Sequence, residues 1–139
     1  MTETPALKRT TEEPSHLTNQ RFDQFDLRPE LLEGLAKAEF DYCTEIQAEA
    51  LPLVLAGIDV AGQAHTGTGK TAAFLLAIFQ RLLVNPPADL QVKGAVRAVV
   101  LAPTRELAIQ IHRDAQTLGA FTGLRLGLVY GGTSYQQQQ

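Results

Sequence analysis

The sequence has one cysteine, Cys43, and no apolar run that approaches the roughly 18 residues of a membrane span. A single cysteine excludes a disulfide framework and a cysteine-rich zinc site within one chain, and it fits the reducing cytosol. The amino terminus is polar and lacks the apolar core of a signal peptide. We therefore expect a cytoplasmic protein with no membrane partner.

The sequence also has little net charge. Its formal net charge is −3, so any nucleic-acid partner must be held by a local site rather than by the global field. Hydrophobic residues make up 45% and charged residues 19% of the chain, which indicates a packed core rather than disorder. A length of 139 residues fits one domain and excludes a complete two-domain machine.

The apolar spacing divides the chain into a tail and a folded part. Residues 1–19 are rich in Thr, Glu and Pro and predict a flexible polar tail. A helical face then begins after Pro29, and the Thr44 to Gln47 pattern is typical of a capping box at the start of a second helix. Pro52 should bend or divide that second helix before Gly57 ends it.

The remainder alternates short apolar runs with helical stretches, which is typical of βαβ units. We expect strands at 58–61, 96–102 and 124–130, helices from 70 to about 83 and from 105 to about 118, and a loop at 85–94. The predicted fold class is α/β, with a parallel β-sheet flanked by helices.

The strongest chemical signal is Ala-His-Thr-Gly-Thr-Gly-Lys-Thr at 64–71, between a predicted strand and a predicted helix. Gly67 and Gly69 allow a tight turn whose backbone N–H groups can approach a phosphate chain. As candidate catalytic residues, Lys70 would reach the β and γ phosphates of a nucleotide and the Thr71 hydroxyl would ligate Mg²⁺. A plain strand-to-helix turn with incidental glycines is the competing interpretation.

Three further segments, taken with this loop, resemble the amino-terminal half of a DEAD-box RNA helicase. They are Phe-Asp-Tyr-Cys-Thr-Glu-Ile-Gln at 40–47, Pro-Thr-Arg-Glu-Leu-Ala at 103–108 and Gly-Gly at 131–132. The resemblance implies a Q-motif region at 20–48 and, at 49–139, the amino-terminal part of a first RecA-like phosphate-loop domain. The Asp-Glu-Ala-Asp box and a second RecA-like domain do not occur in the sequence. We therefore expect a truncated domain that holds only the ATP-binding motifs and part of the RNA-binding motifs.

A narrower likeness is to the bacterial branch of this family that works in the RNA degradosome. It rests on residues 16–22, Cys43-Thr44, residues 56–63 and residues 130–135. The likeness implies a role in RNA degradation and a degradosome endonuclease as a partner.

The resemblance implies an ATP site with Mg²⁺. Gln47 would recognise the adenine edge, because an amide donor and acceptor together match one base edge; capping alone is its alternative role. Phe40 would stack on the adenine, and Phe22 lies in the register of the family's upstream aromatic. A core position for Phe40 and a tail anchor for Phe22 are the alternatives. The phosphate contacts would come from Ala64, His65, Thr66, Gly67, Thr68, Gly69, Lys70 and Thr71.

The sequence departs from the family pattern at several of these places. The family usually has Gly at 39, Pro at 43 and 45, and Gln at 65, where this chain has Glu39, Cys43, Glu45 and His65. Ala64 stands where the general phosphate-loop pattern has Gly. A histidine beside phosphates could titrate, and a side chain that points away from the loop is the alternative.

The resemblance also implies an RNA site. The family grips single-stranded RNA through its backbone, without sequence preference, with the segments that here are Pro103, Thr104, Arg105, Gly131 and Gly132. A helix start after the carboxyl end of a strand is where such sheets bind ligands. A simple turn is the alternative role of the two glycines.

The predicted function is an ATP-dependent RNA helicase that unwinds short RNA duplexes by hydrolysing ATP. The alternative is a non-catalytic, truncated remnant that binds ATP or RNA.

Overall fold

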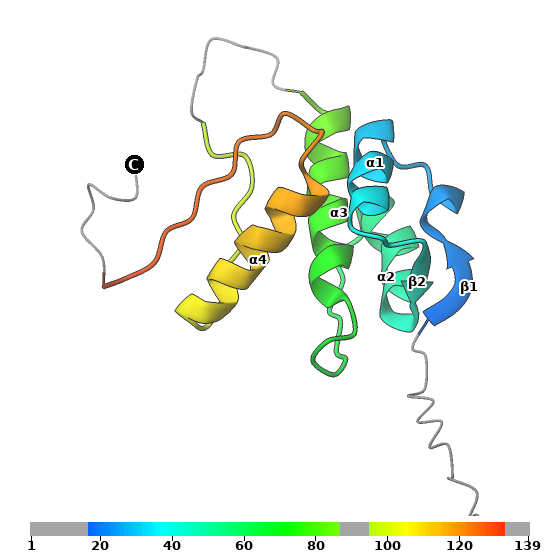
Figure 1. The fold of residues 1–139 in the computed structure, drawn as a ribbon, viewed down its shortest axis with the longest axis horizontal. Coiled ribbons are helices and arrows are strands. Elements are labelled where there is room, and N and C mark those ends of the chain that lie inside the picture. Colours follow the sequence, from blue (N-terminus) through cyan, green and yellow to red (C-terminus); the bar gives the residue numbers. More distant parts are fainter. Residues whose placement is uncertain (1–16, 87–94, 133–139) are drawn as a thin grey trace, which may run out of the picture.

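The computed structural model describes residues 17–86 and 95–132. Within them lie four α-helices and one two-stranded sheet (Figure 1). The order is β1 (Leu17–Arg21), the 3₁₀ helix η1 (Phe22–Gln24), α1 (Pro29–Lys37), β2 (Tyr42–Thr44), α2 (Glu45–Leu55), α3 (Lys70–Val84) and α4 (Arg105–Leu118).

Helix α3 occupies the middle of the molecule, with α1 and α2 on one side and α4 on the other (Figure 1). Its apolar residues face nearly every direction, so the helix is largely covered, as the sequence predicts. The core around it includes Leu31, Leu35, Leu51, Leu75, Leu76, Phe79, Ile111 and Leu118. This packing fixes the two helix ends, those of α3 and α4, on which the candidate sites are built.

The helix predictions are confirmed. Pro29 is at the start of α1, and α3 and α4 begin at Lys70 and Arg105. Helix α2 runs through Pro52 as one helix, so the proline does not divide it, and it ends before Gly57, which has a φ of 82°.

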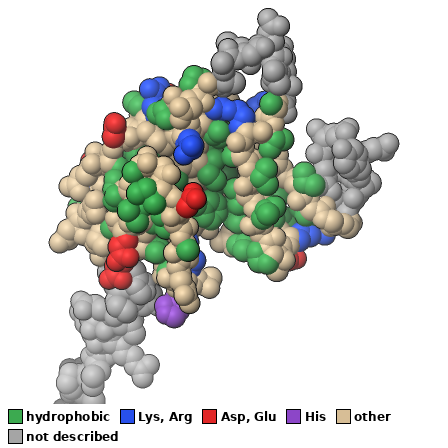
Figure 2. Space-filling view, turned by 180° about the vertical axis from the view of Figure 1, so that it is seen from behind, with side chains coloured by type: hydrophobic (Ala, Val, Ile, Leu, Met, Phe, Trp, Pro, Cys, Tyr) green, Lys and Arg blue, Asp and Glu red, His purple; other side chains and the backbone are tan. Residues whose placement is uncertain are grey.

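The strand predictions at 58–61, 96–102 and 124–130 are wrong for the residues that the structure describes. The sheet there is instead β1 paired with β2, antiparallel, with Leu17 opposite Thr44. A strand needs ladder hydrogen bonds to a neighbour, and in the described ranges none joins the three segments. Apolar side chains on two of them stay exposed, with Leu101 at 90% and Val129 at 78%. Figure 2 shows hydrophobic side chains gathered on one open face.

The polar tail ends earlier than predicted, because β1 already begins at Leu17. The Thr18 hydroxyl donates to the Cys43 carbonyl at 2.9 Å, so a polar residue pairs with β2 here. Polar composition therefore does not keep Leu17–Asn19 out of a strand. The rest of the predicted tail, most of the predicted loop at 85–94 and the end of the chain lie outside the described residues.

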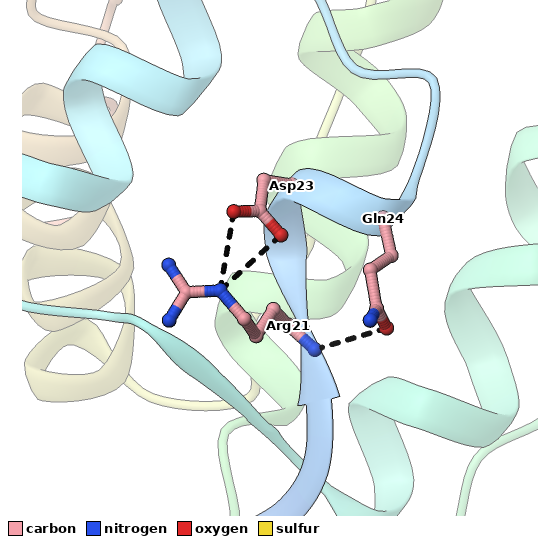
Figure 3. Close-up of polar contacts among 3 residues, drawn as sticks. All are labelled: Arg21, Asp23 and Gln24. Carbon is pink, nitrogen blue, oxygen red and sulfur yellow. Dashed lines mark hydrogen bonds and ion pairs between the residues drawn. The ribbon is translucent and has the colours of Figure 1, made fainter.

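Arg21 joins β1 to the elements around it (Figure 3). Its Nε donates to Asp23 at 3.1 Å, its backbone N–H donates to Gln24 Oε1 at 3.3 Å, and its guanidinium lies 5.3 Å from the centre of the Tyr42 ring. The hydrogen bond to Asp23 raises the pKa of Arg21. These contacts hold the start of η1, where Phe22 enters the core.

Glu39 ends α1 in the left-handed region, with a φ of 59°. The Glu39 and Phe40 N–H groups donate back to Ala36 and Leu35 at 3.1 and 2.9 Å, which is a Schellman end. Glu39 thus adopts a left-handed conformation that glycine would reach with less strain. This turn sets the direction of Phe40.

Candidate functional site

Two left-handed glycines shape the loop that precedes α3. Gly67 and Gly69 have φ values of 83° and 84°, which side chains with a Cβ rarely adopt. At Gly69 a Cβ would also overlap the side-chain amide of Gln47. The tight turn predicted at Gly67 and Gly69 is present in the backbone, and it opens directly into the N-terminus of α3.

The Lys70 ammonium lies inside the curve of this loop. Its Nζ donates to the carbonyls of Ala64 and His65, at 2.8 Å for His65. The Thr68 hydroxyl donates to the same His65 carbonyl at 2.7 Å. In the part of the chain that the structure describes, no carboxylate pairs with Lys70. Among the described residues, its charge therefore interacts with the Ala64 and His65 carbonyl dipoles and with no carboxylate, and it is available to an anion.

Gln47 connects α2 to the same loop. The side chain is 3% exposed; its Oε1 accepts from the Thr44 backbone N–H at 2.9 Å, and its Nε2 donates to the Gly69 carbonyl at 3.0 Å. The first bond confirms the predicted cap. The Thr44 hydroxyl adds a bond to the Thr68 carbonyl at 2.7 Å, which the sequence analysis missed. The cap of α2 and the loop are thus one hydrogen-bonded unit.

A groove of about 880 Å³ runs beside this unit. Phe40 and loop residues 66–71 line it together, and Phe40 is 42% exposed, so part of its side chain is accessible to a ligand. Phe22 is different: it is 3% exposed and packs in the core. Its burial supports the anchor role over base stacking. Thr71 also lines the groove, in the first turn of α3.

The two predicted RNA segments meet at the start of α4. Pro103, Thr104 and Arg105 are exposed, and the Thr104 hydroxyl caps α4 by accepting from the Leu107 N–H at 3.2 Å. The Arg105 guanidinium lies 4.5 Å from the centre of the Tyr130 ring. In the sequence, Tyr130 directly precedes Gly131 and Gly132. Both glycines are exposed, and Gly132 has a φ of 89°. The sequence motifs indicate Arg105 and the two glycines, whereas the contact of Arg105 with Tyr130 is visible only in the structure.

Among the described residues, the other reactive groups offer no second site. Cys43 is fully buried, and burial raises the pKa of its thiol to about 11, so it stays protonated and is a poor nucleophile. Burial also raises the pKa of Asp114, which lines the groove. Among the described residues, no three His, Cys, Asp or Glu side chains gather as metal ligands. In those residues, too, every helix is too short or too polar to cross a bilayer.

A glycine-shaped loop that opens into a helix beginning Lys-Thr defines a phosphate-loop nucleotide-binding domain. Comparison with family models assigns the chain to one family within that class. A model of the DEAD/DEAH box helicase family matches residues 44–139, and the chain belongs to this family.

Individual relatives agree with this assignment. An ATP-dependent RNA helicase RhlB from Photobacterium profundum is 57% identical over 125 residues, which cover 90% of this chain and 29% of that protein. Among solved structures, the RNA helicase Prp28 from Chaetomium thermophilum, bound to ADP, matches with a TM-score of 0.74 and 32% identity over 88% of this chain and 29% of that one. S. cerevisiae Dbp5 bound to RNA and ADP BeF3 matches with a TM-score of 0.66 and 39% identity, covering 76% and 26%.

These matches confirm the predicted likeness to RecA-like helicase domains of the α/β class, although the parallel sheet is not formed among the described residues. The chain spans under a third of the length of the relatives it matches.

Proposed function

We propose that this chain is the ATP-binding part, and a portion of the RNA-binding part, of an ATP-dependent RNA helicase that unwinds short RNA duplexes. The observation that carries the proposal is the hydrogen-bonded unit of Thr44, Gln47 and the phosphate loop. It joins a base-recognition position to a phosphate-binding turn. The two solved relatives described above hold ADP or ADP BeF3, which supports a nucleotide at the same loop.

The ATP site would use groups that the structure already gathers. The N–H groups of residues 66–70 would donate to phosphate oxygens, with Ala64 and His65 at the entrance of the loop. Lys70 would exchange its two carbonyl partners for the β and γ phosphates. Thr71 would hold Mg²⁺, which offsets phosphate charge when it is bound. Phe40 and Gln47 would receive the adenine.

The RNA site would use Pro103, Thr104, Arg105, Gly131 and Gly132. Arg105 would contact a phosphate, and the glycines would let the chain approach the backbone closely. Such contacts carry no base information, so RNA would bind without sequence preference.

We also propose the wider setting implied by the likeness at residues 16–22 and 56–63. The protein would act in the cytoplasm in RNA degradation, with an endonuclease partner. Residues 20–48 would form the Q-motif region, and residues 49–139 would be part of the first RecA-like domain.

A chimaera tests the helicase function. The matching segment of the Photobacterium relative is replaced by this chain, and RNA-stimulated phosphate release and unwinding of a short duplex are measured. We expect both activities within about tenfold of the parent protein, since the phosphate loop and the Arg105 surface are complete. A chimaera that folds and binds ATP but neither hydrolyses it nor unwinds RNA would favour the non-catalytic alternative.

Gln47→Ala tests base selection in the 139-residue chain. Loss of a buried hydrogen-bonding amide should weaken ATP binding by about 1–3 kcal/mol, measured by calorimetry. GTP should be affected less if Gln47 reads adenine. Equal losses for ATP and GTP would assign Gln47 only to holding the loop through Gly69. Gln116→Ala, on the exposed face of α4, is the matched control and should change neither affinity.

A further inference from the structure

The contact between Arg105 and Tyr130 links two segments that lie far apart in the sequence. Arg105 is the first residue of α4, and Tyr130 directly precedes Gly131. The guanidinium carbon is 4.5 Å from the ring centre, well within the range of a cation–π contact. Arg105 is exposed and Tyr130 is half-buried, so the ring is the more firmly held partner.

A guanidinium that lies face-on over an aromatic ring keeps its N–H edge open to a ligand. All five N–H donors of arginine lie in the plane of the group, whereas a ring contact uses the face. A stacked arginine can therefore still donate two parallel hydrogen bonds to a phosphate. Without the ring, the long Arg105 side chain would sample many rotamers, and binding would have to order it.

The charges around Arg105 also favour binding of an anion. In residues 17–86 and 95–132, the ion pairs are Arg21 with Asp23 and Arg28 with Glu30, and Arg105 takes part in neither. Glu106 follows Arg105 in the first turn of α4, but no carboxylate in these ranges forms an ion pair with Arg105. The Thr104 hydroxyl and the amino end of α4 lie beside it, which adds a positive partial charge.

We propose that Tyr130 is a positioning residue that holds Arg105 with its N–H edge open to one phosphate of single-stranded RNA. This rests on the proposed function, because it assumes that RNA binds at this surface. Tyr130 acts through Arg105 and does not itself contact the RNA.

The test measures binding of a fluorescent single-stranded RNA oligonucleotide to the 139-residue chain over a range of salt concentrations. Tyr130→Leu should weaken binding about two- to fivefold, whereas Tyr130→Phe, which keeps the ring, should bind as the unchanged chain does. Arg105→Ala should weaken binding about tenfold and lower the slope of log affinity against log salt by about 0.7, the value for one single-strand phosphate contact. Tyr130→Leu should lower the same slope, and it should have no further effect in the Arg105→Ala background.

Tyr42→Leu is the matched control. Tyr42 makes the same kind of contact, with the Arg21 guanidinium 5.3 Å from its ring centre, but on β2 and not at the start of α4. It should leave RNA affinity unchanged. The stack itself is read separately from the NMR shift of the Arg105 side-chain Nε–H. Tyr130→Leu should move this shift and Tyr130→Phe should not.

The outcomes separate the two proposals. If the unchanged chain does not bind RNA, or if Arg105→Ala has no effect, the RNA surface is wrong and the positioning role falls with it. If Arg105→Ala weakens binding but Tyr130→Leu does not, the surface stands and the positioning role is overturned. Additive losses, or an unchanged salt slope in Tyr130→Leu, would make Tyr130 a direct RNA contact and would also overturn it.

Discussion

Gly34→Ala should destabilise the chain by about 1–3 kcal/mol, although alanine is the better helix former. Gly34 is buried in α1 where this helix crosses the end of α4, and a Cβ there would overlap the backbone carbonyl of Leu118. A backbone atom inside a packed helix cannot rotate away as a side chain could. Relief therefore requires α1 and α4 to separate, which opens contacts of Leu31 and Leu35 in the core. Denaturant unfolding of the two chains measures the difference.

Gly127→Ala provides the matched control. A Cβ at Gly127 would meet nothing within 4 Å, and its φ is not in the left-handed region. Its unfolding free energy should therefore change by less than about 0.5 kcal/mol. Equal stability of the Gly34 and Gly127 variants would show that α1 and α4 are not in close contact in solution.

The helices could be predicted because residues close together in the sequence mark where each helix begins and ends. Thr104 caps α4 through an N–H only three residues away, and Thr44 with Gln47 forms the start of α2 within one turn. Gly67 and Gly69 indicate the turn before α3, because few other residues adopt their φ values. Such signals need no knowledge of the rest of the fold.

The contacts that make the site could not be predicted in the same way. The bond from Gln47 to Gly69 spans 22 residues, and that from Thr44 to Thr68 spans 24. Neither leaves a pattern in the sequence beyond the cap itself. The stack of Arg105 on Tyr130 is likewise visible only in three dimensions.

Apolar runs were the least reliable signal. The run at 96–102 indicates that side chains favour burial, but a strand also needs a partner for its backbone, and the described residues provide none. Phe22 shows a related limit. An aromatic residue in a given register fits both base stacking and a core position, and its 3% exposure places it in the core.

Lys70→Ala should have the largest functional effect. In the chimaera with the Photobacterium relative, it should reduce RNA-stimulated ATP hydrolysis at least about a hundredfold, which is the scale for removing one preorganised donor from developing charge. The reason is that Lys70 brings the ammonium that lies within the phosphate loop, where only the Ala64 and His65 carbonyls meet its charge. Phosphate release measures the loss, and RNA binding without nucleotide should stay nearly unchanged.

Lys37→Ala is the control for removing a lysine, because Lys37 lies on α1 and its ammonium is 5.7 Å from the centre of the Phe121 ring. It should leave ATP hydrolysis near that of the unchanged chimaera. Arg105→Ala should show the reverse pattern to Lys70→Ala, with weaker nucleotide-free RNA binding but intact ATP binding, since α3 and α4 present the two groups from different helix ends. If Lys70→Ala and Arg105→Ala gave the same defects in both assays, the phosphate loop and the start of α4 would form one site, and the separation of ATP from RNA contacts argued from this geometry would be wrong.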